Sequence, residues 1–281
     1  MGQTSRRLHD RLKKMGGSAG PVRPRRGRAD LPSVEGFIQQ GLDPIHAAYA
    51  YVQNITSFFA EGVSQFPEMK SWARVVGKAE EEYMPSGPPM SPLTGSFFTT
   101  WAFYDLKIGT GPDTLGKCLI DANDVVQMNP DQLDALKKLC DSRMGIYEHV
   151  GTQGPHVRLR ELITGDEFAC HVGSGYRGRG GELWYVRLLP PLVPELATYH
   201  IAFTTPYILT RTSREDWAVF LKRTMLPLRA EDERAGLHRL LKDGPNANYW
   251  NEYVLKAYHH HQPDAIFLAG IPDLKDTLPH A

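Results

Sequence analysis

The chain has 281 residues, of which 41% are hydrophobic and 10% aromatic, so composition predicts a folded core and excludes a globally disordered protein. No apolar run approaches the roughly 18 residues that a membrane-spanning helix needs, and the first residues lack the apolar region of a secretory signal. The three cysteines, Cys118, Cys140 and Cys170, are widely spaced, which favours free thiols and a cytoplasmic location over a disulfide framework.

The formal net charge is zero, but the charge is unevenly distributed. Residues 1–28 carry nine Lys or Arg and one acid, a charge of +8, so the remaining chain carries −8. Because residues 1–32 are also rich in Gly and Pro, we predict a disordered basic arm, in which only a short helix around Arg6–Met15 is conceivable. Two interpretations stay open: a solvated tail, or an arm that contacts nucleic acid or another anionic surface. The second assigns the contact to Arg23, Arg25, Arg26 and Arg28.

Residues 33–143 are predicted to be helical. Asp43-Pro44 and Asn129-Pro130 each combine a helix-capping residue with proline, which is favoured at the first helical position. In the segment Ser96–Lys107, aromatic residues recur three and four positions apart, which predicts a buried helix. A strand is the alternative for this segment, because aromatic and β-branched residues also favour sheets.

Residues 144–212 have the pattern of short strands separated by glycine turns. The predicted strands are Ile146–Val150, Val157–Ile163, Glu167–Val172, Leu183–Leu189 and Tyr199–Thr205. Five short strands with tight turns predict a small, partly closed β-barrel-like module. Residues 213–281 return to helical spacing and begin with a capping-box pattern at Ser213 and Asp216, so they are predicted to form a helical cap. The expected fold class is α+β: a helical N-terminal half, a five-stranded barrel-like module and a helical C-terminal cap.

The loop GSGYRGRGG, residues 173–181, is the best candidate for an anion-binding or nucleic-acid-binding site. Successive glycines let backbone N–H groups converge on an anion, and Arg177 and Arg179 can add charge-assisted hydrogen bonds. Tyr176 offers a stacking face for a base. The alternative is a hairpin loop with solvated arginines, because the phosphate-loop pattern and the dinucleotide fingerprint are both missing from the sequence.

Catalytic and metal-binding patterns are weak. Cys170 and His171 have the residue types of a nucleophile and its base, but neighbours on a strand point to opposite faces and cannot form a dyad. Zinc and calcium motifs are missing from the sequence, so we expect no metal and no cofactor. His259, His260 and His261 fall near the end of a predicted helix, where they suit the helix dipole better than a metal ion.

Five segments together resemble a group of uncharacterised bacterial proteins. These are FFTTWAFYDL (97–106), TLGKCLID (114–121), SRMGIYEHV (142–150), RELITGDEF (160–168) and ELWYVRLLP (182–190). In that group an FxxWxxFD-like segment precedes a β-module with an RDLLTGE-like strand, where this chain has Arg160–Asp166. Some members carry a SEC-C zinc tail, and this chain has no such cysteine-rich tail, so a zinc function does not carry over. The group has no established activity, so the resemblance implies an architecture and no function.

These observations support three functional hypotheses. The first is a non-enzymatic binding or adaptor protein, with the β-module as recognition surface for an unidentified protein partner and the basic arm as an electrostatic tether. The second is a nucleic-acid-associated protein that uses the arm together with Arg177 and Arg179, with weak contacts mainly to phosphate. The third is a hydrolase with an unrecognised pocket. No membrane partner is expected.

Overall fold

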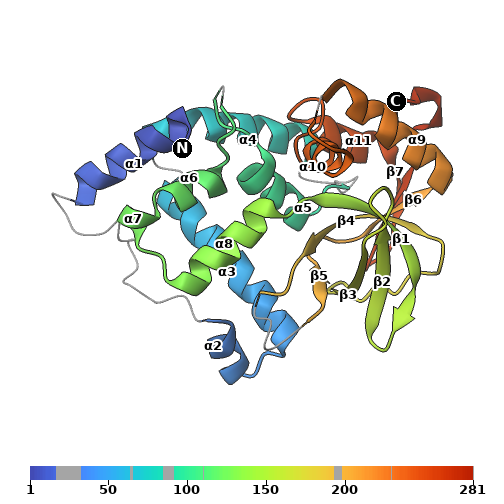
Figure 1. Cartoon of the computed structure of the whole chain (residues 1–281), viewed down its shortest axis with the longest axis horizontal. Helices are drawn as coiled ribbons and strands as arrows, with labels where there is room; N and C mark the ends of the chain where they lie inside the picture. Colours follow the sequence, from blue (N-terminus) through green and yellow to red (C-terminus); the bar gives the residue numbers. More distant parts are fainter. Residues whose placement is uncertain are drawn as a thin grey trace. The chain divides into compact units, whose positions relative to one another are not determined.

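The computed structural model describes residues 1–16, 33–63, 66–84, 92–109, 111–192, 198–228 and 230–280. The chain folds into two compact units, which we describe separately (Figure 1). The helical unit comprises Met1–Lys78, Thr100–Asp141 and Leu192–Ala197, and the barrel unit comprises Ala79–Thr99, Ser142–Pro191 and Thr198–Ala281. The boundary at Asp141/Ser142 lies next to the predicted start of the β-module.

The helical unit is built from helices that begin where the sequence places capping residues. Its elements are α1 (Gln3–Gly16), α2 (Val34–Gln39), α3 (Pro44–Val63), η1 (Pro67–Met69), the first part of α4 (Lys70–Tyr83), η2 (Trp101–Asp105), α6 (Leu115–Asp121), α7 (Asn123–Val126) and α8 (Pro130–Asp141). Asp43 accepts hydrogen bonds of 3.0 Å from the backbone N–H groups of Ile45 and His46, which confirms the predicted start of α3. Helix α8 begins at Pro130, also as predicted, and packs against α3 and α6.

The aromatic segment predicted as a buried helix is helical, and the strand alternative is wrong. Gly95–Thr100 forms α5, and Trp101–Asp105 continues as the π-helical segment η2, in which Leu106 N–H bonds to the carbonyl of Trp101 at 2.8 Å. All five residues of η2 are buried, and Trp72 of α4 donates a 2.9 Å hydrogen bond to the carbonyl of Ala102. The segment 97–106, one of the five that carry the resemblance, is therefore part of the core.

The prediction of a disordered arm is wrong for its first half. Gln3–Gly16 forms helix α1, in which Leu8 and Leu12 are 0% and 2% exposed, and α1 packs on α6. Leu8 and Leu12 are four residues apart and place a narrow apolar stripe on an otherwise basic helix, which the composition of the segment does not reveal. Residues 17–32, including Arg23, Arg25, Arg26 and Arg28, lie outside the described part of the chain.

The barrel unit contains a closed ring of five strands. The strands are β1 (Met144–Gln153), β2 (His156–Glu161), β3 (Glu167–Val172), β4 (Leu183–Leu189) and β5 (His200–Ala202). The ring runs β1-β2-β3-β5-β4 and closes by pairing β4 with β1; β3 and β5 are parallel, and the other pairs are antiparallel. The predicted five-stranded barrel is thus confirmed.

The barrel interior is filled by one apolar face of each strand. Cys170 and Val172 of β3 and Trp184 and Val186 of β4 belong to this buried cluster. Alternation along β3 places Glu167, Ala169 and His171 on the opposite, outer face. Strand β4 is buried at every residue, because it pairs with strands on both sides and is covered on both faces.

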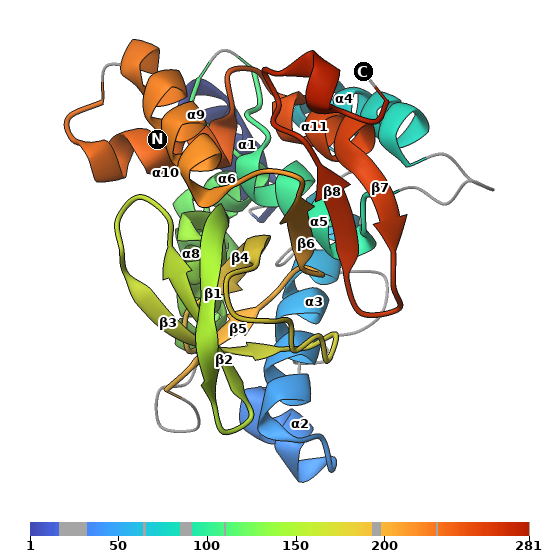
Figure 2. The same ribbon diagram turned by 90° about the vertical axis from the view of Figure 1, so that its right-hand side faces the viewer.

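The C-terminal part of the barrel unit corrects the prediction of an all-helical cap. It contains α9 (Arg214–Met225), η3 (Leu226–Leu228), α10 (Glu233–Asp243), α11 (Tyr249–Ala257) and η4 (Lys275–Thr277), but also strands β7 (Tyr258–His261) and β8 (Ile266–Ala269). Strand β6 (Tyr207–Thr210) lies within the predicted β-module, just after the predicted strand Tyr199–Thr205. The additional strands extend the sheet beside the barrel in the order β4-β6-β8-β7 (Figure 2). The four-residue strands β7 and β8 are too short for alternation to reveal them in the sequence.

The predicted capping box at the start of α9 is confirmed by reciprocal hydrogen bonds between Ser213 and Asp216. Throughout the described part of the chain, no helix has both the length and the apolar character to cross a bilayer.

Candidate functional site

The glycine loop predicted as an anion site folds against the end of the barrel. The phenol of Tyr176 donates to the carboxylate of Glu182 at 3.2 Å, and its ring lies 5.3 Å from that of Trp184. Gly178 has a φ of 60°, and a side chain there would collide with Trp184 and Glu182. The loop conformation is therefore fixed by packing against β4, and a carboxylate lies inside the predicted anion site.

The two loop arginines have different environments. The Arg177 guanidinium donates to the carbonyls of Pro155 and, at 3.0 Å, of Gly154, so it ties the loop to the β1–β2 turn. The side chain of Arg179 is exposed. The guanidinium of Arg177 is therefore already engaged by backbone carbonyls, and a role of this loop in anion binding stays a prediction.

The cysteines of the barrel and of α6 are poorly placed for nucleophilic catalysis. Cys170 faces the barrel interior, as predicted, and burial raises the pKa of its thiol well above the usual value. Its cross-strand neighbour His200 has a pKa lowered by burial. Both shifts favour the uncharged forms, so a thiolate–imidazolium pair is disfavoured. Burial also raises the pKa of Cys118 to about 12.

The three consecutive histidines lie on strand β7, which corrects their predicted position at a helix end. Arg211 lies 2.8 Å from Nε2 of His259, and an arginine can only donate, so this nitrogen accepts. The proton of neutral His259 then resides on Nδ1, which lies 2.6 Å from Nδ1 of His260. This chain of hydrogen bonds explains the geometry without a metal. Within the described ranges, no group of three or more His, Cys, Asp or Glu side chains is arranged to hold a metal ion.

A cluster of three rings lies on the outer face of the barrel, on neighbouring strands. The ring of Tyr199, just before β5, lies 4.2 Å from that of His156 at the start of β2, with an interplanar angle of 33°. The Tyr199 ring also lies 6.3 Å from the ring of His171 of β3, with an interplanar angle of 47°. All three side chains are half-buried and outside the barrel core. We call these residues, His156, His171 and Tyr199, the ring cluster.

The second candidate surface lies in the helical unit and includes α1, which is fixed by hydrogen bonds. The backbone N–H groups of Thr4 and Ser5 both donate to Oδ2 of Asp113 at 3.1 Å, so a carboxylate from another segment caps the helix. The Ser5 hydroxyl donates to Asp121 at 2.7 Å, and Arg11 donates to Glu68 at 2.7 Å. These contacts hold one face of α1 and leave its basic face exposed.

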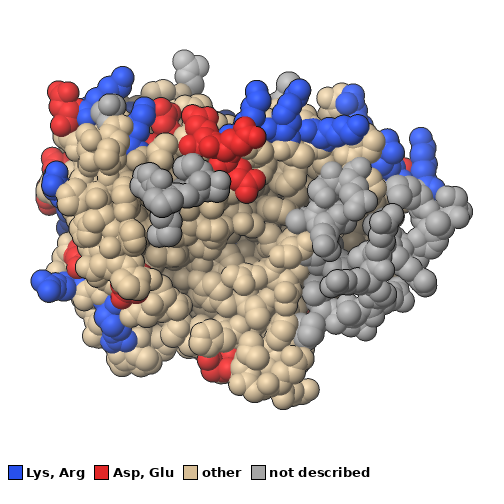
Figure 3. Space-filling view, turned by 180° about the vertical axis from the view of Figure 1, so that it is seen from behind, with Lys and Arg blue, Asp and Glu red and all other residues tan. Residues whose placement is uncertain are grey.

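Five cations on α1 and α4 make no ion pair with any described acid; they are Arg7, Lys14, Lys70, Arg74 and Lys78, and we call them the basic band. Arg7 and Lys14 are seven residues apart on α1, and the three α4 residues are spaced by four, so each set occupies one side of its helix. Figure 3 shows Lys and Arg side chains gathered in a row on one face.

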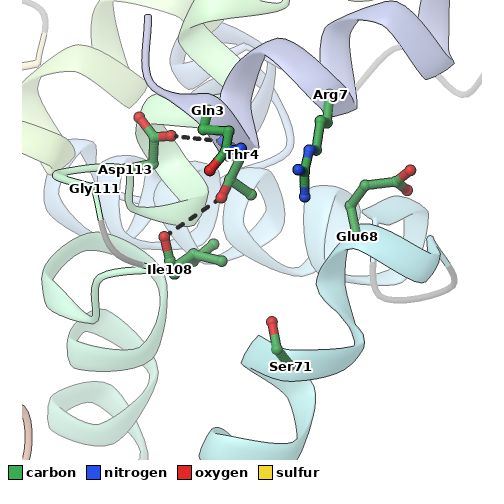
Figure 4. A pocket seen from close by; sticks show the side chains of 9 residues that line it. Gln3, Thr4, Arg7, Glu68, Ser71, Ile108, Gly111 and Asp113 are labelled. Atoms are coloured by element: carbon green, nitrogen blue, oxygen red, sulfur yellow. Dashed lines mark hydrogen bonds between the residues drawn. The ribbon is translucent and has the colours of Figure 1, made fainter.

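A pocket of about 240 Å³ lies between the two helices, and Arg7 and Ser71 line it (Figure 4). One oxygen of each of its carboxylates is engaged, since Oδ2 of Asp113 caps α1 and Oε1 of Glu68 accepts from Arg11. The other oxygens, Oδ1 of Asp113 and Oε2 of Glu68, are buried and have no hydrogen-bond partner among the described residues. Burial opposes ionisation of Glu68, but the hydrogen bond from Arg11 and the nearby charge of Arg7 lower its pKa overall. Because two acids line this pocket and only Arg7 of the basic band does, the pocket itself is a poor site for an anion.

No family model matches the chain, and neither a curated protein nor a solved structure matches it.

Sequence reasoning found neither surface completely. The ring cluster is spread over three segments, and only the register of the barrel brings His156, His171 and Tyr199 together. In the basic band, Arg7 and Lys14 belong to the segment that composition predicted to be a disordered arm. The residues of the band on α4, Lys70, Arg74 and Lys78, are spaced by four in the sequence, and this spacing is the signal that could have revealed them.

Proposed function

We propose that this protein is a binding protein for nucleic acid and that the basic band holds the phosphate backbone. The observation that carries this proposal is the set of five cations without ion-pair partners among the described residues, on α1 and α4, two helices that both line the same pocket through Arg7 and Ser71. Elsewhere in the helical unit, cations such as Lys117 and Lys138 form ion pairs with Asp121 and Asp134. Unpaired cations at helical spacing attract a polyanion without reading its sequence.

The first half of the predicted arm is helix α1, which acts in this proposal as a rigid surface and not as a flexible tether. Because α1 is folded onto the helical unit, Arg7 and Lys14 are held in place before binding. Pre-organisation reduces the entropy that binding costs. Arg23, Arg25, Arg26 and Arg28 follow α1 in the sequence and extend the same positive charge. The barrel remains the proposed recognition surface.

The test measures how affinity depends on salt. A labelled 20-base-pair DNA duplex is titrated with the full chain at roughly 50 to 200 mM salt, and the slope of log K against log salt is compared between variants. Arg7→Gln combined with Arg74→Gln should reduce the magnitude of the slope by about 1.8, which is about 0.9 for each phosphate that is no longer neutralised. Deleting residues 1–28 is unsuitable, because it would expose the apolar surface that Leu8 and Leu12 cover.

The control removes the same charge from arginines that already have carboxylate partners. Arg158 pairs with Glu167, and Arg214 lies 3.6 Å from Glu148. Arg158→Gln combined with Arg214→Gln should leave the slope within experimental error of the unmodified protein. The proposal fails if the basic-band variant keeps the original slope, or if both double variants reduce it equally. Replacing the four arginines at 23–28 with Gln separates their share from that of the folded band.

A further inference from the structure

The pocket of the helical unit contains acceptors that receive no hydrogen bond. All of its lining residues belong to this one unit. Asp113 is 1% exposed, and its Oδ1 has no partner among the described residues; Oε2 of Glu68 is buried and has none either. A buried carboxylate oxygen without a donor is costly, because neither the protein nor the solvent compensates its charge. Both residues line the pocket, so a donor bound there lies next to both carboxylates.

The same pocket also presents donors without an acceptor. The guanidinium of Arg7 forms no ion pair with a described acid, and Ser71 is exposed on α4. Figure 4 shows the guanidinium of Arg7 and the hydroxyl of Ser71 pointing toward each other across the pocket. The N–H groups of an arginine form a planar fork that matches the two oxygens of a carboxylate. The acceptor that Arg7 lacks is therefore best supplied by a carboxylate.

The charges around the pocket are balanced, which disfavours a ligand with a single charge. Glu68 and Asp113 contribute two negative charges. Two positive charges come from Arg7 and from Arg11, which donates to Glu68. A small anion would be repelled by the acids, and a small cation by the guanidinium of Arg7. The volume of about 240 Å³ is below the roughly 300–1,000 Å³ of pockets for drug-sized molecules, so the ligand is small.

We propose that this pocket binds a small zwitterion of the α-amino acid class, a role that goes beyond the proposed binding of nucleic acid. The ammonium group of such a ligand supplies the donor that Asp113 and Glu68 lack. Its carboxylate supplies the acceptor for Arg7, and the hydroxyl of Ser71 donates to the same group. A zwitterion thus places each of its charges next to an opposite charge and leaves the net charge of the pocket unchanged.

The experiment uses the full chain and asks whether both charges of the ligand are needed. Thermal unfolding is measured with each of the protein amino acids at about 10 mM, because a ligand that binds the folded state raises the midpoint. The amino acid with the largest effect is then compared by calorimetry with two analogues, the amine without the carboxylate and the acid without the amino group. The amino acid should bind once per chain and at least about tenfold more tightly than either analogue.

Two variants locate the site. Arg7→Gln should weaken binding of the amino acid by roughly 10- to 150-fold, which corresponds to the loss of a charged hydrogen bond. Ser71→Ala should weaken it by roughly 2- to 10-fold, as for a neutral hydrogen bond. Both side chains are exposed, so both variants should fold. The matched control is Arg6→Gln: Arg6 is the exposed neighbour of Arg7 on α1 but does not line the pocket, so binding should stay within about twofold.

The amino-acid site is refuted if no amino acid raises the midpoint, or if the amine or the acid analogue binds as tightly as the amino acid. It is also refuted if Arg7→Gln leaves binding unchanged, or if Arg7→Gln and Arg6→Gln weaken it equally, which would indicate a general effect of charge. These measurements contain no DNA. The proposed function is therefore judged separately, by the salt slope of the basic-band variant.

Discussion

Removing the carboxylate of Asp113 should loosen α1 without unfolding the protein. Oδ2 of Asp113 accepts both N–H groups at the start of α1, from Thr4 and Ser5, at 3.1 Å. Asp113 is 1% exposed, so water does not compete for these bonds in the folded state. Loss of an N-cap costs about 1 kcal/mol, and here two backbone donors lose a charged acceptor, so we expect about 1–2 kcal/mol for Asp113→Ala.

The effect should remain local, because other interactions keep α1 in place. Burial of Leu8 and Leu12 contributes about 1.5–3 kcal/mol each, which exceeds the cost of removing the cap. Helix α1 therefore stays folded most of the time but opens more often. A change of about 1–2 kcal/mol corresponds to a roughly 5- to 30-fold faster exchange of the α1 backbone amides.

Hydrogen exchange followed by mass spectrometry provides the assay. Peptides covering α1 report the opening, and peptides covering α8 of the same molecule serve as the internal reference. Glu81→Ala is the control variant, because Glu81 is an exposed acid of α4 and caps no described amide of α1 or α8. The reasoning is refuted if Asp113→Ala leaves α1 protection unchanged, or if α8 loses protection to the same extent, which would indicate global unfolding.

Two further predictions concern pH and backbone conformation. The hydrogen bond to Asp124 raises the pKa of His9 against the effect of burial, and Asp10 adds to the rise. The stabilisation is therefore complete below the unfolded-state pKa of about 6.5 and is lost as the pH rises through the raised pKa of the folded state. Protection of α1, corrected for intrinsic exchange, should fall as the pH rises above about 6.5, and His9→Gln should remove this dependence. Gly178→Ala should lower the free energy of unfolding by about 1–3 kcal/mol, because φ of Gly178 is 60° and the new methyl group would collide with Trp184. Gly180→Ala is the control: its methyl group would meet nothing within 4 Å, so the free energy of unfolding should change by less than about 0.5 kcal/mol. Chemical denaturation of both variants checks this, and equal effects would contradict it.

The sequence by itself determined the local structure where one segment contains the whole signal. Asp43 with Pro44 marks the start of α3, and Ser213 with Asp216 forms the capping box of α9, because capping involves residues only a few positions apart. The strands Glu167–Val172 and Leu183–Leu189 have the predicted bounds, since alternation and apolar runs reveal a strand directly. The α+β class and the five-stranded barrel follow from such local signals.

Tertiary structure alone decided the features that depend on residues far apart in the sequence. Helix α1 is ordered because Leu8 and Leu12 are buried against distant segments and because Asp113, more than 100 residues away, caps its first turn. Composition alone shows neither contact and therefore pointed to disorder. The ring cluster exists because parallel pairing of β3 with β5 places Tyr199 beside His171. Arg177 looked available for an anion until the fold placed it on the carbonyl of Gly154. Local patterns specify hydrogen bonds within a segment, whereas binding surfaces arise from interactions that form only when distant segments meet.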